Sequence, residues 1–192
     1  ECMMQDFPTI FQGDDATRVG FTSITDDFPA FSPVKNATSD GVAIQARGTH
    51  PGVAATGEAD QYDAVRKIMM HLGCRIDAPK EEVHRGIRVV GGPAIVVRAS
   101  FACCPPEYKK RFPTPEKVKI SARSYLVLEG DVTVESLDLD GSLVVKCEEG
   151  ASGVIRDLVV KNEGWKRVVV SEEENEGERE VVKMRGYRVE KM

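Results

Sequence analysis

The sequence has no long apolar run and no excess of basic residues. No hydrophobic stretch approaches the ~18 residues that a membrane-spanning helix needs. The first residues also do not combine a basic region with an apolar one, as a signal peptide does. Acidic residues outnumber basic ones, 31 to 26, which gives a net charge of -5. Because nucleic acids are bound by basic surfaces, we expect no nucleic-acid partner. The missing apolar run and signal-peptide pattern lead us to expect no membrane association and a cytoplasmic location.

Recognisable metal-ligand patterns are also missing. The five cysteines are an odd number and no two of them have the C-x-x-C spacing. His50, His71 and His84 are too far apart in sequence to form a ligand motif, so we expect no structural zinc site. Cys103 and Cys104 are adjacent, and disulfides between neighbours are rare and strained. We therefore expect reduced, half-buried thiols.

Hydrophobic residues make up 41% of the 192 residues, enough to build one large domain or two small ones. The sequence does not begin with methionine, and we expect it to be part of a longer protein. It divides into three regions: an α/β part at 1–78, a linking β-region at 79–117 and an all-β region at 118–192.

The first region combines several predicted elements. Residues 19–24 alternate as a strand does, and prolines keep residues 28–36 extended. The glycine-rich stretch 41–57 resembles an exposed loop. Residues 58–72 form one apolar helical face, with Thr56 as the N-cap and Gly73 at the C-terminal end. The apolar positions of that face are Ala59, Tyr62, Val65, Ile68, Met69 and Leu72.

In the linking region, residues 86–92 and 94–99 are predicted to be two strands joined at a Gly-Gly-Pro turn. Residues 105–111 are predicted to form a short helix that begins at proline. Near the C-terminus, residues 181–189 alternate apolar and basic side chains, which predicts a final strand.

Short apolar triplets recur through 118–170 at intervals of five or six residues, with small or polar residues between them. This period is typical of a short parallel β-helix, or solenoid, in which alternate residues point inward. Antiparallel hairpins are the competing interpretation, because Asp140-Gly141 is a good turn pair. The spacing leaves little room for ordinary strands plus turns, so the solenoid is favoured.

Lys35 is the principal candidate for chemistry. It stands in the loop stiffened by Pro33, and a lysine ammonium can contact phosphate oxygens and offset developing charge. Further polar donors follow it closely or lie in the glycine-rich stretch. These candidate substrate-binding residues are Asn36, Thr38, Ser39, Arg47 and His50.

Several motifs together resemble those of the UDP-sugar pyrophosphorylases. Residues 31–36, FSPVKN, are similar to that family's aromatic-Ser/Ala-Pro-Val-Lys-Asn loop, and residues 1–8, ECMMQDFP, to its ECMMQDYP stretch. AATGE at 54–58, LDLDGSLVV at 137–145 and VKNEGW at 160–165 resemble further family motifs in the same order. No single motif is decisive, whereas the ordered set covers almost the whole chain.

The resemblance implies a function and a fold. Members of this family join UTP and a monosaccharide 1-phosphate into UDP-sugar and pyrophosphate with Mg²⁺. The resemblance therefore implies that Lys35 contacts a substrate phosphate. The chain would be the C-terminal part of such an enzyme: the remnant of a GT-A-like α/β nucleotidyltransferase domain followed by a β-helix. It would be a monomer that works with the N-terminal part of the same protein.

Two departures from the family pattern limit the function expected of this chain. The family's glycine-rich nucleotide loop has no counterpart here, so we expect the chain alone to be inactive and the Mg²⁺ ligands to lie outside it. Ala55 also stands where the family tends to carry small polar residues. The alternative function is a solenoid scaffold or oligomerisation module without catalysis.

Overall fold

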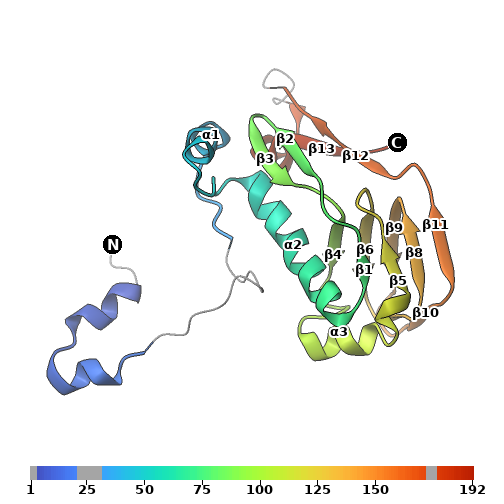
Figure 1. Ribbon diagram of the computed structural model, residues 1–192, viewed down its shortest axis with the longest axis horizontal. Helices are drawn as coiled ribbons and strands as arrows, with labels where there is room; N and C mark the ends of the chain where they lie inside the picture. The colour runs from blue at the N-terminus through green and yellow to red at the C-terminus, as the bar shows by residue number, and fades with distance from the viewer. Residues whose placement is uncertain (1–3, 21–31, 172–176) are drawn as a thin grey trace.

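Two short 3-10 helices, η1 (Met4–Ile10) and η2 (Gly13–Arg18), begin the computed structural model, which describes residues 4–20, 32–171 and 177–192. They lie apart from the remainder of the chain (Figure 1). The strand predicted at 19–24 falls mostly outside the described residues.

Two helices follow where the sequence predicted a loop and then one helix. α1 spans Thr38–Ala46 and α2 spans Ala54–Leu72. The prediction of an exposed loop over 41–57 is therefore wrong for the residues that lie in these helices, whereas residues 47–53 between them are a loop. Gly41 is buried inside α1, where a Cβ would overlap Cγ1 of Val53. Gly41 is needed because its missing side chain allows close packing. From composition alone, a glycine in this role cannot be distinguished from one in a flexible loop.

The start of α2 also differs from the prediction, whereas its end agrees. Val53 is the residue before the helix, and Thr56 lies within its first turn. The Thr56 hydroxyl accepts the Val53 N–H at 3.2 Å and donates to the Val53 carbonyl at 2.9 Å, so it stabilises the helix start from inside. Gly73 ends the helix in the left-handed region, with φ of 109°, as expected.

Three parallel sheets dominate the second half of the chain. The largest has the order β1 (Arg75–Ile76), β5 (Val118–Ile120), β8 (Leu137–Asp140), β11 (Leu158–Lys161). The second has the order β4 (Ala94–Val97), β6 (Tyr125–Glu129), β9 (Ser142–Lys146). The third pairs β7 (Val132–Val134) with β10 (Gly153–Ile155).

From β4 to β11, each strand belongs to a different sheet from the strand that follows it. β8, β9 and β10 lie in three separate sheets, and β11 returns to pair with β8, with Leu158 beside Leu137. The antiparallel alternative is wrong here, because the strands on either side of Asp140-Gly141 do not pair with each other. Burial alternates along β5, β7 and β8, as predicted for inward-pointing residues. Parallel pairing is what a solenoid requires, and the solenoid itself stays a prediction.

The linking region contains the expected helix and strands. α3 (Pro105–Arg111) begins at proline as predicted, and η3 (Pro115–Lys117) follows it. The two predicted strands correspond to β3 (Ile87–Val90) and β4, which lie in different sheets. β3 forms an antiparallel pair with β2 (Glu81–His84), whereas β4 pairs with β6.

The C-terminal residues form a helix and a strand where one strand was predicted. α4 spans Glu180–Arg185, and β13 (Tyr187–Lys191) pairs antiparallel with β12 (Trp165–Val169). Gly186, with φ of 80°, separates the two elements. The prediction that the region after residue 117 is all β is therefore wrong at α4. This helix was missed because six residues are too few to show a clear helical period.

Helix α2 runs along the sheets, with α1 near its first residues and α3 near its last (Figure 1). The main core lies between the parallel strands, α2 and α3, and contains Met69, Phe101, Phe112, Leu126 and Leu139. A smaller core joins the start of α2 to β3 and β13. Among the described helices, not one combines the length and apolar character that crossing a bilayer requires.

Candidate functional site

The backbone around Lys35 is held in place while its side chain is free. The Lys35 and Asn36 N–H groups both donate to the Gly52 carbonyl, at 2.9 and 3.1 Å. The Asn36 amide Nδ2 donates to the Pro51 carbonyl at 2.8 Å. The exposed Lys35 side chain makes no ion pair or hydrogen bond with any residue that the structure describes. An accessible ammonium group on a fixed backbone is suited to binding an anion.

Two glycines allow this loop to approach α2 closely. Gly52 has φ of +58°, and a Cβ there would lie 3.2 Å from both Asn36 Nδ2 and the Pro33 carbonyl oxygen. Gly57, on the first turns of α2, leaves the space that the Val34 side chain occupies. Val34, the residue before Lys35, thus packs directly against α2.

Asp60 ties the same loop to α2 at a second place. Its Oδ2 accepts a hydrogen bond from the Ser32 hydroxyl at 2.5 Å and lies 3.3 Å from His50 Nε2. His50 Nδ1 accepts the Gly52 N–H at 3.2 Å, which leaves Nε2 as the nitrogen that carries the proton toward Asp60. Ser32, His50 and Asp60 therefore hold the loop before Lys35 and the Gly52 segment that anchors it.

Sequence reasoning missed Ser32 and Asp60. They are 28 positions apart, and no spacing rule connects a loop serine with a helix carboxylate. His50 was predicted to contact substrate. Both of its ring nitrogens face partners within the chain, so it holds the loop, and its contact with substrate stays a prediction.

The other predicted residues are divided between the two ends of α1. Thr38 and Ser39 are its first residues and follow Lys35 closely, whereas Arg47 comes directly after its last residue. A nine-residue helix is ~13 Å long at 1.5 Å per residue, which separates Arg47 from the Lys35 end. The N-terminal N–H groups of α1 face the same end as Lys35, and such groups favour anions.

A cavity of about 240 Å³ lies between α1, α2 and β3. His50 and Asp60 line it on the side of the Lys35 loop, and Gln45 and Arg88 line it on the side of β3. The Gln45 amide donates to the Arg88 carbonyl at 3.0 Å and accepts the Arg88 N–H at 2.9 Å, so it fixes α1 to the strand. Two walls of the cavity are consequently tied together by Gln45.

The remaining carboxylates of α2 near the loop are already paired. Glu58 accepts two hydrogen bonds from Arg185, at 2.9 and 3.1 Å, and one from the Tyr62 hydroxyl. Asp63 contacts the buried Arg66 at 3.1 Å and Lys67 at 3.0 Å. With their charge offset by cations, these groups do not form a set of free oxygen ligands for Mg²⁺.

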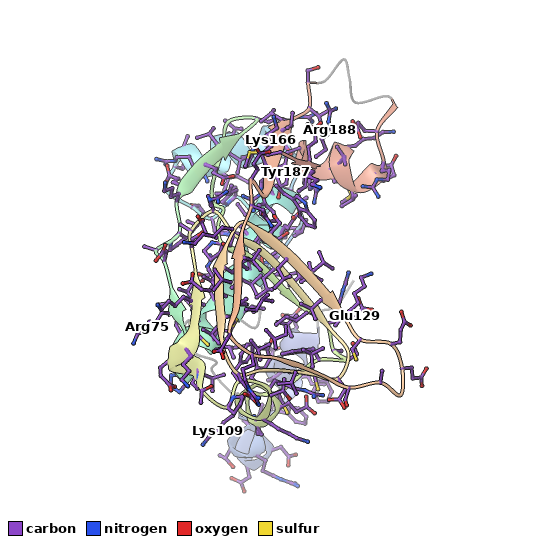
Figure 2. The ribbon with its side chains drawn as sticks, turned by 90° about the vertical axis from the view of Figure 1, so that its right-hand side faces the viewer. Arg75, Lys109, Glu129, Lys166, Tyr187 and Arg188 are labelled. Atoms are coloured by element: carbon purple, nitrogen blue, oxygen red, sulfur yellow. The ribbon has the colours of Figure 1, made fainter. Side chains whose placement is uncertain are left out.

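Arg167 joins α2 to the C-terminal strands. Its side chain is only 5% exposed, and it donates to Glu82 at 2.8 Å and to the Gly91 carbonyl at 3.0 Å. Its guanidinium lies 5.4–5.9 Å from the ring centres of Tyr62, Tyr125 and Tyr187. Figure 2 shows Tyr187, Lys166 and Arg188 gathered at this end of the molecule. Burial raises the pKa of Tyr187 well above its ordinary value, so the ring stays neutral beside Arg167.

Comparison with known proteins gives two close matches in sequence. The chain is 30% identical to a UDP-sugar pyrophosphorylase of Oryza sativa subsp. indica and 29% identical to that of subsp. japonica. Both alignments cover the whole of this chain. The chain spans about 30% of the length of these curated relatives. No protein-family model matches the sequence.

Proposed function

Because the chain belongs to the UDP-sugar pyrophosphorylase family, we propose that it supplies the Lys35 loop to an enzyme that forms UDP-sugar and pyrophosphate from UTP and a monosaccharide 1-phosphate. In this proposal the chain is the C-terminal part of the enzyme, and the nucleotide-binding half belongs to other sequence of the same protein. The isolated chain is inactive, since it has no glycine-rich nucleotide loop.

The observation that carries this proposal is the exposed ammonium of Lys35, which has no partner among the described residues, on a loop held by Gly52, Gly57 and Asp60. Attack of a sugar-phosphate oxygen on the α-phosphorus of UTP requires in-line positioning and neutralisation of negative charge. Lys35 contacts a phosphate oxygen and offsets that charge. Because the loop is ordered beforehand, little ordering is needed when the substrate binds.

The neighbouring polar residues play supporting roles. Asn36 fixes the backbone, and Thr38 and Ser39 at the start of α1 offer N–H and hydroxyl donors to the same phosphate. His50 holds the loop, while Arg47, at the far end of α1, contacts a more distant part of the substrate. Mg²⁺, when bound, neutralises phosphate charge. Its ligands lie outside this chain in this proposal, since Glu58 and Asp63 are paired with cations and Asp60 is engaged by Ser32 and His50.

We further propose that the three parallel sheets are the faces of a short β-helix that packs against the remnant of the GT-A-like domain. Strands that move from sheet to sheet and pair in parallel with the previous turn support this arrangement. The β-helix supports α2 through the main core, and Arg167 on the neighbouring β12 adds a second support. Helix α2 in turn carries the Lys35 loop. The enzyme is a cytoplasmic monomer in this proposal.

A scaffold role is the second candidate function. Among the described strands, β9, β10 and β11 are each the last strand of their sheet, so their outer edges could pair with another copy. Sedimentation of the chain distinguishes the two functions: a monomer favours the enzymatic role, and a stable dimer or trimer favours the scaffold.

The test of the enzymatic proposal is turnover by the full-length protein with Lys35→Ala. We expect kcat to fall by about a hundredfold or more, as for the loss of one charge-stabilising donor. Lys166→Ala, which removes an exposed lysine on β12, serves as the matched control and should turn over normally. Near-normal turnover of Lys35→Ala would refute the assignment.

A further inference from the structure

A second set of reactive side chains lies at the other end of α2, on and just before α3. The Cys103 and Cys104 sulfurs and a carboxylate oxygen of Glu107 all lie within 4.8 Å of one another. Both thiols are free, and Cys103 and Glu107 are exposed. Figure 1 shows α3 at the end of α2 opposite α1, so this cluster is separate from the Lys35 loop.

We propose that Cys103, Cys104 and Glu107 bind one thiophilic divalent cation of the zinc class. Two thiolates and a carboxylate are ligands that zinc accepts, with bonds of about 2.0–2.3 Å, and a solvent molecule completes four-coordination. Thiolate ligands also select against Mg²⁺ and Ca²⁺, which prefer oxygen. The site is separate from the proposed uridylyltransferase function and does not depend on it.

The local backbone favours this arrangement before any ion binds. The Cys103 N–H donates to Glu107 Oε2 at 2.7 Å, which directs the carboxylate back toward the two sulfurs. Pro105 and Pro106 lie between the ligands and fix two φ angles. The donor atoms need to approach to about 4 Å for bonds of this length, which small side-chain rotations achieve.

Nearby cations do not occupy the site. Arg111 donates to the Phe101 carbonyl and pairs with Asp131, so its charge is engaged away from the thiols. Lys109 is exposed, and Figure 2 shows it at the lower end of the molecule. Binding replaces two S–H bonds with two sulfur–metal bonds and releases two protons to solvent, with no change of oxidation state.

This site was not predicted from the sequence, because the spacing rule for structural zinc requires C-x-x-C pairs. Adjacent cysteines followed by a carboxylate on the first turn of a helix do not match that rule. The proposed site is accordingly a surface chelate with an open coordination position, and the fold does not depend on it.

The experiment titrates the reduced chain with Cd²⁺, whose bonds to thiolates absorb in the ultraviolet. We expect one ion per chain, displacement by Zn²⁺ and no displacement by excess Mg²⁺. The absorption should disappear in the Cys103→Ser, Cys104→Ser double variant and persist in Cys147→Ser, the matched control. Glu107→Gln keeps the acceptor for the Cys103 N–H, and we expect it to weaken binding about tenfold or more, on the scale known for groups that support metal sites.

Three outcomes would overturn the proposal: no thiolate absorption with the unaltered chain, equal binding by the double serine variant, or unchanged affinity in Glu107→Gln. Circular dichroism of each variant confirms that it is folded. If the double variant does not fold, the Glu107→Gln affinity and the Zn²⁺ competition decide the proposal by themselves.

Discussion

Val34 packs onto Gly57 so closely that a Cβ at position 57 would overlap the Val34 Cγ2 methyl group. Val34 is the residue before Lys35, and Gly57 lies in the first turns of α2. The position of Lys35 therefore depends on residue 57 being glycine, because any larger residue would displace Val34.

Gly57→Ala should displace the Lys35 loop. Overpacking costs about 1–3 kcal/mol, while alanine favours the helix by about 1 kcal/mol, so the free energy of unfolding should fall by only about 0–2 kcal/mol. Hydrogen exchange of the Lys35 and Asn36 amides, which bond to Gly52, should become about tenfold faster or more. Adding Val34→Ala removes the overlap and should restore slow exchange; fast exchange that persists in the double variant would contradict the packing argument.

Asp60→Ala should loosen the same loop by a different route. It removes the acceptor of the Ser32 hydroxyl and the partner of His50, and a hydrogen bond to a charged group contributes about 1.5–3 kcal/mol. We expect faster amide exchange at Lys35 and, in the full-length protein, a lower kcat. Gln61→Ala, at the neighbouring exposed position of α2, is the control and should leave both unchanged. Equal effects of the two variants would show that Asp60 has no special role.

Arg167→Ala should be strongly destabilising. The buried guanidinium holds Glu82, the Gly91 carbonyl and three tyrosine rings together, and loss of one partner leaves the others without compensation. We expect a loss of about 3 kcal/mol in the free energy of unfolding, measured with urea. Lys166→Ala should change it by less than about 0.5 kcal/mol. A small effect of Arg167→Ala would mean that α2 is held to β12 and β13 by other contacts.

Glu82 should make stability fall in acid. Its hydrogen bond to His84, together with the charge of Arg167, holds the pKa of this carboxyl below its usual value of 4.5. An acid whose pKa is lowered by folding contributes stability above its unfolded pKa, and that contribution is lost as pH falls through the lower folded value. We expect the free energy of unfolding to drop below about pH 4.5, with a shallower drop in Glu82→Gln. Identical pH profiles would contradict this role.

The sequence predicted the elements whose patterns are long or regular. The apolar face of α2 and the glycine at its end were readable because a nineteen-residue helix repeats its period several times. The inward residues of β5, β7 and β8 follow from simple alternation. α3 was predicted from the prolines at its start.

Features that depend on contacts between distant residues could not be predicted. Gly41 indicated a loop by composition, whereas it lies inside α1 and allows a close approach to Val53. Gly52 does lie in the loop between the helices, but its tight turn against Asn36 could not be predicted. Ser32 and Asp60 come together only because the loop folds over α2. The identity of Lys35 as a candidate came from its motif. The structure added its fixed backbone and an exposed ammonium that contacts no partner within the described ranges.

The most direct test of the central claim is labelling of the full-length protein with uridine diphosphopyridoxal, an aldehyde analogue of UDP-sugar, followed by borohydride reduction and peptide mapping. The aldehyde forms an imine with a lysine near the phosphates, and reduction makes that bond permanent. Our account predicts a label on Lys35 that UDP-sugar prevents, with Lys166 unmodified. The account would be contradicted if labelling reaches saturation and is prevented by UDP-sugar, but Lys35 is not the residue that is modified.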